Sequence, residues 1–257
     1  MPDTDKTLRD LEKSLKDLGI ELKSFSVTDS TNNEAKKYSI NASDHHPVLF
    51  LAEEQSGGRG RLGRSFSSRK GGIYMSLLFF TDLKLSDIVS VTTAAAVAVA
   101  ASIESVTGNG MKIKWVNDIY SSEGKVSGIL TESVSSNGRS AIIVGIGINV
   151  GKPDFPEDLK SIAASVGEIG DKKNGLIVNI ASKLIAFFSS PHDRSYMAEY
   201  RKRAMFLGEQ VDLFSAGELT FSGKMLNIDD DGGLIFLPDG KSDSVVIRTG
   251  EISVRKK

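Results

Sequence analysis

Glycines and arginines alternate in EEQSGGRGRLGRSF, residues 53–66. Glycine lets a backbone approach a ligand closely, and guanidinium groups form paired hydrogen bonds with the anionic oxygens of carboxylates and phosphates. The run therefore indicates a site at which a carboxylate meets a nucleoside triphosphate. For this segment taken alone, a solvated basic loop remains an open alternative.

The same run has the G-x-G-x-x-G spacing of a dinucleotide-binding loop at Gly58, Gly60 and Gly63. That motif must lead directly into a helix, whose N-terminus holds the pyrophosphate. Here RSFSSRKGG follows, which predicts turns and then another strand. The context therefore excludes a dinucleotide site. Phe66 is the only aromatic residue in the run, which argues against a surface for single-stranded nucleic acid.

A second group of polar residues lies farther along, in KWVND (114–118), GKVSGILTES (124–133) and GIGINVG (145–151). It places Lys, Asn and Asp near the ends of predicted strands. Glycines within strands often mark places where a ligand lies flat on a sheet. For Gly145 and Gly147, tight packing of a helix on the sheet is an equal alternative.

The elements that must position these residues follow from periodicity. Helical spacing predicts helices at 5–18, 86–106, 175–189 and 194–205, and Thr31-Asn-Asn-Glu34 has the spacing of a capping box that begins another helix. Apolar runs predict strands at 47–55, 73–80, 111–115, 126–133 and 140–150. From about residue 207 only short strands separated by Gly and Asp turns remain, which suggests a small barrel. We place a domain boundary near Phe206.

Composition restricts the class of protein. Of 257 residues, 40% are hydrophobic and 25% charged, with a formal net charge of −1, as in an ordinary globular chain. Cysteine is absent, which excludes disulfides, thiolate metal sites and a cysteine nucleophile and fits a cytoplasmic protein. The longest apolar run, 94–101, is too short to span a membrane, and no signal-peptide pattern opens the chain. His45 and His46 lack further ligands nearby, so we expect no metal site.

Together, the motifs resemble the biotin protein ligase family. The matching blocks, in order, are Ser30-Thr31-Asn32, Gln55, GRGRLGR (58–64), KWVND, Lys125-x-x-Gly128-Ile-Leu, the Gly-x-Gly-x-Asn strand that ends at Asn149, and GEISVR (250–255). The resemblance implies an α+β fold, with a mixed sheet and helices as in class II aminoacyl-tRNA synthetase cores and a C-terminal SH3-like barrel. The implied domains are 1–206 and 207–257.

The resemblance also implies a two-step reaction. Biotin and ATP, which brings Mg²⁺, form biotinyl-5′-adenylate, and a lysine of a biotin carboxyl carrier domain of a biotin-dependent carboxylase then takes the biotinyl group. Some family members carry a DNA-binding winged helix, but only about 25 residues precede the catalytic motifs here. We therefore expect no DNA partner and no membrane partner, and we consider a homodimer.

The resemblance assigns roles to individual residues. Lys125, Arg59, Arg61 and Asp118 are the catalytic candidates, with Lys125 at the biotin carboxylate and α-phosphate and Asp118 beside the carrier lysine. The biotin slot is assigned to Ser30, Thr31, Asn32, Gln55, Gly58, Arg59, Gly60, Arg61, Lys125, Gly128, Leu130, Gly145 and Gly147. ATP is assigned to Arg61, Phe66, Lys114, Asn117 and Asn149, while Arg64 and Arg69 are expected at the periphery.

Two residues depart from the family pattern. Val116 stands where the family usually has proline, and Phe66 replaces a tryptophan, so ATP affinity is the parameter most affected. A lipoate-protein ligase of the same fold and a non-catalytic biotin-binding relative are the alternatives. Lipoyl and octanoyl transferases use a cysteine nucleophile, which this chain lacks.

Overall fold

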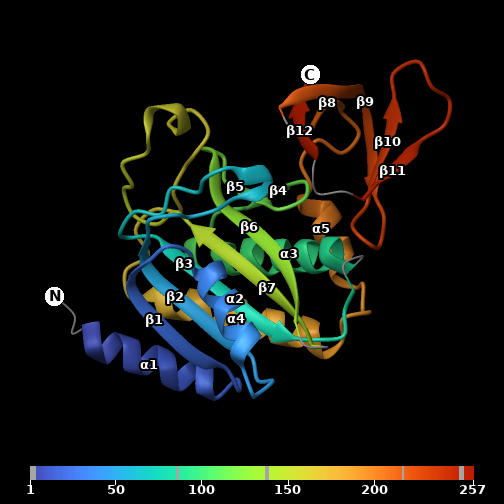
Figure 1. Ribbon diagram of the computed structural model, residues 1–257. Helices are drawn as coiled ribbons and strands as arrows, with labels where there is room; N and C mark the ends of the chain where they lie inside the picture. Colours follow the sequence, from blue (N-terminus) through green and yellow to red (C-terminus); the bar gives the residue numbers. More distant parts are fainter. Residues whose placement is uncertain (1–3, 85–86, 137–138, 216, 249–251) are drawn as a thin grey trace.

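The computed structural model describes residues 4–84, 87–136, 139–215, 217–248 and 252–257. A seven-stranded mixed sheet runs in the order β1-β2-β3-β7-β6-β5-β4 (Figure 1). Its strands are β1 (Glu21–Thr28), β2 (Val48–Gln55), β3 (Ile73–Phe80), β4 (Lys112–Lys114), β5 (Asp118–Tyr120), β6 (Lys125–Ser136) and β7 (Arg139–Ile148). Only β1 and β2 pair in parallel; the other neighbours are antiparallel.

The two faces of this sheet carry different layers. Successive side chains of a strand point to opposite faces, so Ile142, Val144 and Ile146 of β7 face the large apolar core. Helices α1 (Thr4–Lys16), α3 (Ile88–Thr107), α4 (Lys172–Ser189) and α5 (Tyr196–Arg203) contribute to that core. Ala141 and Ile143 face a smaller core beneath α2 (Thr31–Asn41) on the other face. The face under α2 is the one that continues into the polar and glycine positions of the motifs.

Helix α3 is the central helix of the core. It is long and apolar enough to cross a membrane, but 67% of its apolar window is buried inside the fold. Its alanine-rich sequence suits close packing on the sheet, and a left-handed Gly108 with φ of 75° ends it. The structure confirms the helix predicted at 86–106, although residue 86 itself lies outside the described residues.

A second, five-stranded sheet follows in the order β11-β10-β9-β8-β12. It contains β8 (Gln210–Ser215), β9 (Glu218–Ile228), β10 (Leu234–Pro238), β11 (Val245–Ile247) and β12 (Ile252–Lys256), and every pairing is antiparallel. Its buried Leu213 and Val254 join the large apolar core, and the Trp115 indole N–H donates to the Gly232 carbonyl at 2.9 Å. The short strands predicted after residue 207 are thus confirmed. The boundary at residue 206 stays a prediction.

The sequence differs from the structure in two local respects. Strands β1 and β5 were not predicted, because neither has a run of buried apolar residues. The capping box at Thr31 is wrong: Ser30 is the N-cap residue of α2, and it makes no side-chain capping bond. The Thr31 hydroxyl lies instead near Gln55 and Ser76, in the interior of the site.

Candidate active site

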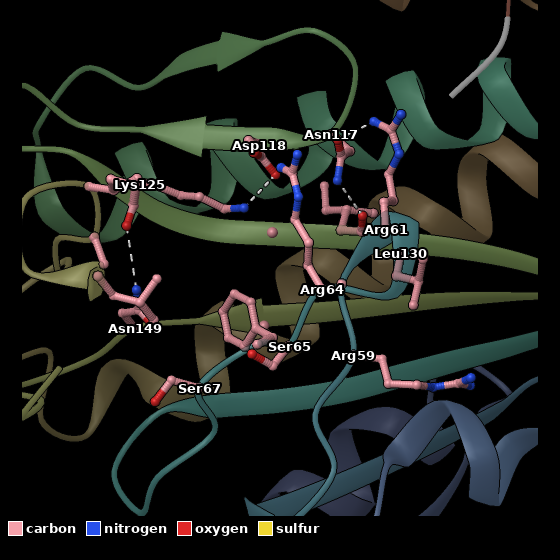
Figure 2. Close-up of a pocket in the computed structure, with 18 of the residues that line it drawn as sticks. Arg59, Arg61, Arg64, Ser65, Ser67, Asn117, Asp118, Lys125, Leu130 and Asn149 are labelled. Carbon is pink, nitrogen blue, oxygen red and sulfur yellow. Dashed lines mark hydrogen bonds and ion pairs between the residues drawn. The ribbon is translucent and has the colours of Figure 1, made fainter. Parts of the chain in front are cut away.

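One cavity of about 870 Å³ brings together most of the residues singled out by sequence. Its wall includes Ser30, Thr31, Asn32, Gln55, Arg59, Gly60, Arg61, Phe66, Lys114, Asn117, Asp118, Lys125, Gly128, Leu130, Gly145, Gly147 and Asn149. Figure 2 shows the arginine loop facing Lys125 and Asp118 across this space. Gly58 is not part of the wall. A side chain there would meet the Phe66 carbonyl and the Ser68 hydroxyl, so Gly58 permits the close packing of the loop on itself.

The floor of the cavity is made by glycines of β6 and β7. Gly128 and Gly147 are directly paired across these strands, and the Phe66 ring lies against both. A Cβ at Gly147 would overlap the Phe66 ring, and a Cβ at Gly145 would overlap the Asn32 amide. Both glycines therefore leave space for side chains of the site, Asn32 and Phe66. The alternative explanation from the sequence was tight packing of a helix on the sheet.

Replacing Gly147 with alanine tests the floor. We expect the added methyl to displace the Phe66 ring into the cavity and to weaken biotin binding at least about tenfold, as overpacking costs of 1–3 kcal/mol imply. Titration calorimetry with biotin measures the effect. Gly175→Ala in α4 is the matched control, because a Cβ there meets nothing within 4 Å. Unchanged biotin affinity in Gly147→Ala would contradict this account of the floor.

The polar end of the cavity is an ordered network. The Thr31 backbone N–H donates to Gln55 Oε1 at 2.8 Å, and Gln55 Nε2 donates to the Ser68 hydroxyl at 2.8 Å. Asn32 Nδ2 donates to Glu132 Oε2 at 2.7 Å, and the hydroxyl of the buried Ser76 contacts Thr31 and Asn32. Sequence reasoning missed Ser68, Ser76 and Glu132. The period-two alternation of β3 and β6, which puts Ser76 and Glu132 on the same face as the glycines, was the available signal.

The opposite end of the cavity holds an ion pair. Lys125 Nζ lies 2.7 Å from Asp118 Oδ1, and the side chains are 26% and 23% exposed. Sheet register places Asp118 of β5 opposite Gly128 of β6. The Lys125 side chain extends from the start of β6 over Gly128, where it meets the Asp118 carboxylate. A primary ammonium held in this way is positioned to bind a carboxylate or phosphate oxygen in the cavity.

Arg61 carries the most constrained charge of the site. Its Nη1 donates to Asn117 Oδ1 at 2.5 Å, and Asn117 Nδ2 in turn donates to the Ile129 carbonyl at 2.8 Å. Its Nη2 is buried and, among the described residues, has no hydrogen-bond partner. Burial lowers the pKa of the guanidinium, and the nearby Asp118 carboxylate opposes this shift. A buried donor without a partner suits an incoming anion.

Further cations surround the same space. Burial lowers the pKa of Lys114, with Lys125, Arg255 and Arg64 adding to the shift and Asp118 opposing it. Arg64 lines the cavity, so its predicted peripheral position is wrong. Arg255 of β12 also lines it and was not singled out; its signal was the closing motif, of which 250 and 251 lie outside the described residues. This excess of positive charge suits a polyphosphate.

Asn149 holds two backbone segments together at the rim. Its Nδ2 donates to the Ala164 carbonyl at 2.9 Å and to the Lys125 carbonyl at 3.4 Å. This anchors the segment after β7, whose Phe155, Leu159 and Ile162 line the cavity and were not predicted. No motif marked them, because apolar residues in a loop carry no distinctive spacing.

The two other features from the sequence lie elsewhere. Arg69 pairs with Asp154 at 2.9 Å and does not line the cavity. His46 Nε2 lies 2.7 Å from Glu21, and the His45 ring packs against Phe80. Within the described residues, no group of three possible metal ligands occurs.

Comparison with known proteins decides the family. A model of the biotin/lipoate A/B protein ligase family matches residues 24–149. The biotin--[acetyl-CoA-carboxylase] ligase of Paracoccus denitrificans is 31% identical, over 88% of this chain and 97% of that protein. The chain belongs to the biotin protein ligase family. The bifunctional ligase/repressor BirA of Bacillus subtilis is 36% identical to this ligase, over 81% of the chain and 67% of the relative.

Solved structures agree with the family and confirm the α+β fold. The biotin protein ligase from Aquifex aeolicus in complex with biotin and ATP is 28% identical, with a TM-score of 0.74 over 92% of this chain and 99% of that one. The mixed sheet with helices predicted from the sequence is therefore correct.

The two departures from the family motif are ordered parts of this ligase. The Trp115–Val116 peptide is cis, and the Val116 carbonyl accepts a hydrogen bond from the fully buried Tyr200 at 3.1 Å. The backbone at Val116 is therefore held in place by α5. The Phe66 ring meets Tyr74 edge-on at 6.4 Å between centroids, in addition to its contact with the glycine floor.

Proposed function

We propose that this ligase activates biotin with ATP as biotinyl-5′-AMP and transfers the biotinyl group to a lysine of a biotin carboxyl carrier domain. One observation carries the proposal. A single cavity joins a hydrogen-bonding end, built on Thr31 and Gln55, to a cationic end, built on Lys125 and on Arg61 with its buried Nη2. A molecule with a polar ring at one end and a carboxylate at the other suits this arrangement.

In the first step, a carboxylate oxygen of biotin attacks the α-phosphorus of ATP and pyrophosphate leaves. Two anions approach each other and charge accumulates on the α-phosphate, so fixed cations should supply much of the rate. Lys125 and Arg61 face the same space and serve this role. Mg²⁺ arrives with ATP, held mainly by the phosphates.

In the second step, the amine of the carrier lysine attacks the acyl carbon and AMP leaves. A lysine has an unperturbed pKa near 10.4, so it must lose a proton before it attacks. Asp118 is placed to help, because its carboxylate lies beside Lys125 at the cationic end. Of the further predictions from the sequence, a homodimer, the absence of a DNA partner and a cytoplasmic location stay predictions.

The polar end favours biotin over lipoate. The ureido ring offers one carbonyl acceptor and two N–H donors, which can pair with the Thr31, Asn32 and Gln55 groups. The dithiolane ring of lipoate offers neither, so it would make no hydrogen bond with these groups. A site built to hydrogen-bond its substrate discriminates strongly against an analogue that lacks those groups.

Pyrophosphate release with ATP and Mg²⁺ tests the function. We expect release with biotin and a kcat/KM with lipoate lower by about 10³-fold or more, because lipoate makes none of the hydrogen bonds of the ureido ring. A carrier domain supplied afterwards should become biotinylated, as mass spectrometry would detect. Release with lipoate alone would overturn the assignment of the polar end. If folded protein released no pyrophosphate with either acid, the result would favour a non-catalytic biotin-binding relative.

A further inference from the structure

A fully buried tyrosine stands behind the KWVND segment of the site. The side chain of Tyr200, in α5, is 0% exposed, and its hydroxyl donates to the Val116 carbonyl at 3.1 Å. Burying a hydroxyl costs free energy unless it is hydrogen-bonded, and a phenylalanine would fill nearly the same space without that cost. What the hydroxyl adds to the fold is its bond to this carbonyl.

The Val116 carbonyl belongs to the peptide unit that leads into Asn117. A peptide unit is planar, so the Val116 carbonyl and the Asn117 N–H turn together. Asn117 is also bound to β6 by two hydrogen bonds with Ile129: its carbonyl accepts the Ile129 N–H at 3.1 Å, and its Nδ2 donates to the Ile129 carbonyl at 2.8 Å. Tyr200 holds the same residue from the side of α5, through the peptide unit before it.

Asn117 in turn directs the guanidinium of Arg61. Its Oδ1 accepts from Arg61 Nη1 at 2.5 Å, and Figure 2 shows these two side chains together at the cationic end of the cavity. Arg61 begins the single-turn helix η1 (Arg61–Gly63), which lies between glycines in a permissive stretch of backbone. The bond to Asn117 therefore fixes where the guanidinium points, and a rotation of the Val116–Asn117 peptide would move it.

Helix α5 is anchored on the side away from the site, so it can hold the tyrosine in place. Arg201, the next residue, donates from Nε to the Ile228 carbonyl of the second sheet at 2.7 Å. Burial raises the pKa of Tyr200 well above its usual range, although the charge of Arg61 opposes the shift. The hydroxyl therefore keeps its proton and stays a donor at neutral pH.

We propose that Tyr200 is a positioning residue for adenylate formation: through the Val116 carbonyl and Asn117, it holds the Arg61 guanidinium where charge develops on the α-phosphate. This inference rests on the proposed function, because biotin activation is the step that it concerns. Tyr200 does not line the cavity, so it acts through Arg61 and not on the substrates. Catalysis is sensitive to such placement, since a 1 Å misplacement can cost about 100-fold in rate.

Tyr200→Phe tests the proposal, because it removes only the hydroxyl. Single-turnover pyrophosphate release at saturating biotin and ATP should be about tenfold slower than in wild type, since the guanidinium remains but is displaced. The midpoint of urea unfolding should fall as well, because the Val116 carbonyl loses its buried donor. The rate is measured without urea, at a temperature at which both proteins are folded. An unchanged rate in folded Tyr200→Phe would overturn the proposal.

Tyr196→Phe is the matched control, one helical turn earlier in α5. The Tyr196 hydroxyl also donates to a backbone carbonyl, at 2.9 Å, but that carbonyl belongs to Ser90 of α3 and not to the KWVND segment. The urea midpoint should fall in this variant too, while pyrophosphate release stays within about twofold of wild type. A tenfold slower release in both variants would show that the packing of α5 in general sets the rate, and would overturn the proposal.

A double-mutant cycle with Arg61→Met tests the route of the effect. The methionine background has no guanidinium to position, so Tyr200→Phe should change the rate of pyrophosphate release there by less than about twofold. A merely structural role of the hydroxyl would leave its effect the same in both backgrounds. A tenfold effect in both would therefore overturn the proposal.

Two provisions complete the design. If Tyr200→Phe fails to fold, Tyr200→4-fluorophenylalanine takes its place, because the fluorine fills the space of the hydroxyl but donates no hydrogen bond; it is judged by the same rate and the same cycle. Pyrophosphate release by wild type with biotin is measured first. If wild type released none, the proposed function itself would be refuted, a result distinct from an active wild type with no effect at Tyr200.

Discussion

Lys125→Ala should release pyrophosphate at least about 100-fold more slowly than wild type with biotin and ATP. Removing one preorganised charge from a transition state costs roughly 3 kcal/mol, and here the loss also leaves the Asp118 carboxylate unpaired beside the reacting anions. Single-turnover pyrophosphate release at saturating biotin and ATP measures the chemical step. The fold should survive, because a partly exposed ion pair contributes at most about 1 kcal/mol to stability.

Lys112→Ala is the matched control for this prediction. Lys112 is an exposed residue of β4, close to the site in sequence but absent from the cavity wall. Its alanine variant should keep wild-type activity and the same midpoint of urea unfolding. Near-normal pyrophosphate release by Lys125→Ala would refute the role assigned to this lysine, while a large fall in its unfolding free energy would make that role structural.

The apolar patterns predicted the layers of the fold well. The runs at 73–80 and 140–150 are buried on both faces of the central strands, so their length and composition were sufficient to identify them. Strand β1 was not predicted because its alternation of polar and apolar residues, from Ser24 to Thr28, is short, and its Val27 is 58% exposed. Position at the edge of a sheet is a tertiary property that a single run of residues does not encode.

The site was predicted where chemistry depends on local motifs and missed where it depends on register. Arg61 and Lys125 belong to recognisable blocks of sequence. Glu132 and Ser76 reach the polar end only because β3, β7 and β6 align Ser76 with Gly145 and Gly145 with Leu130. Arg255 reaches the cationic end only because the second sheet packs beside the first. These placements follow from pairing of distant segments, which spacing along the chain does not reveal.

Arg61→Met should separate activity from stability. The variant keeps a side chain of similar length but removes the charge and the buried Nη2, which has no partner among the described residues. Removing the unpartnered Nη2 should stabilise the folded protein by about 1–3 kcal/mol. The same substitution takes away the donor 2.5 Å from Asn117 Oδ1, which should destabilise it by a similar amount. The two effects offset, so we expect the unfolding free energy to change by less than about 1 kcal/mol. Urea unfolding without ligands measures it.

Activity should respond very differently. Pyrophosphate release should fall by about 10²–10³-fold, because the desolvated guanidinium is a preorganised donor for the developing phosphate charge. ATP at 100 times its wild-type dissociation constant should stabilise wild type by about 2.7 kcal/mol and the variant far less. Arg69→Met, which removes an exposed arginine that pairs with Asp154 at the surface, should change neither quantity. A loss of more than about 3 kcal/mol in Arg61→Met would instead make Arg61 a structural residue, because an offsetting pair of hydrogen-bond effects cannot produce so large a change.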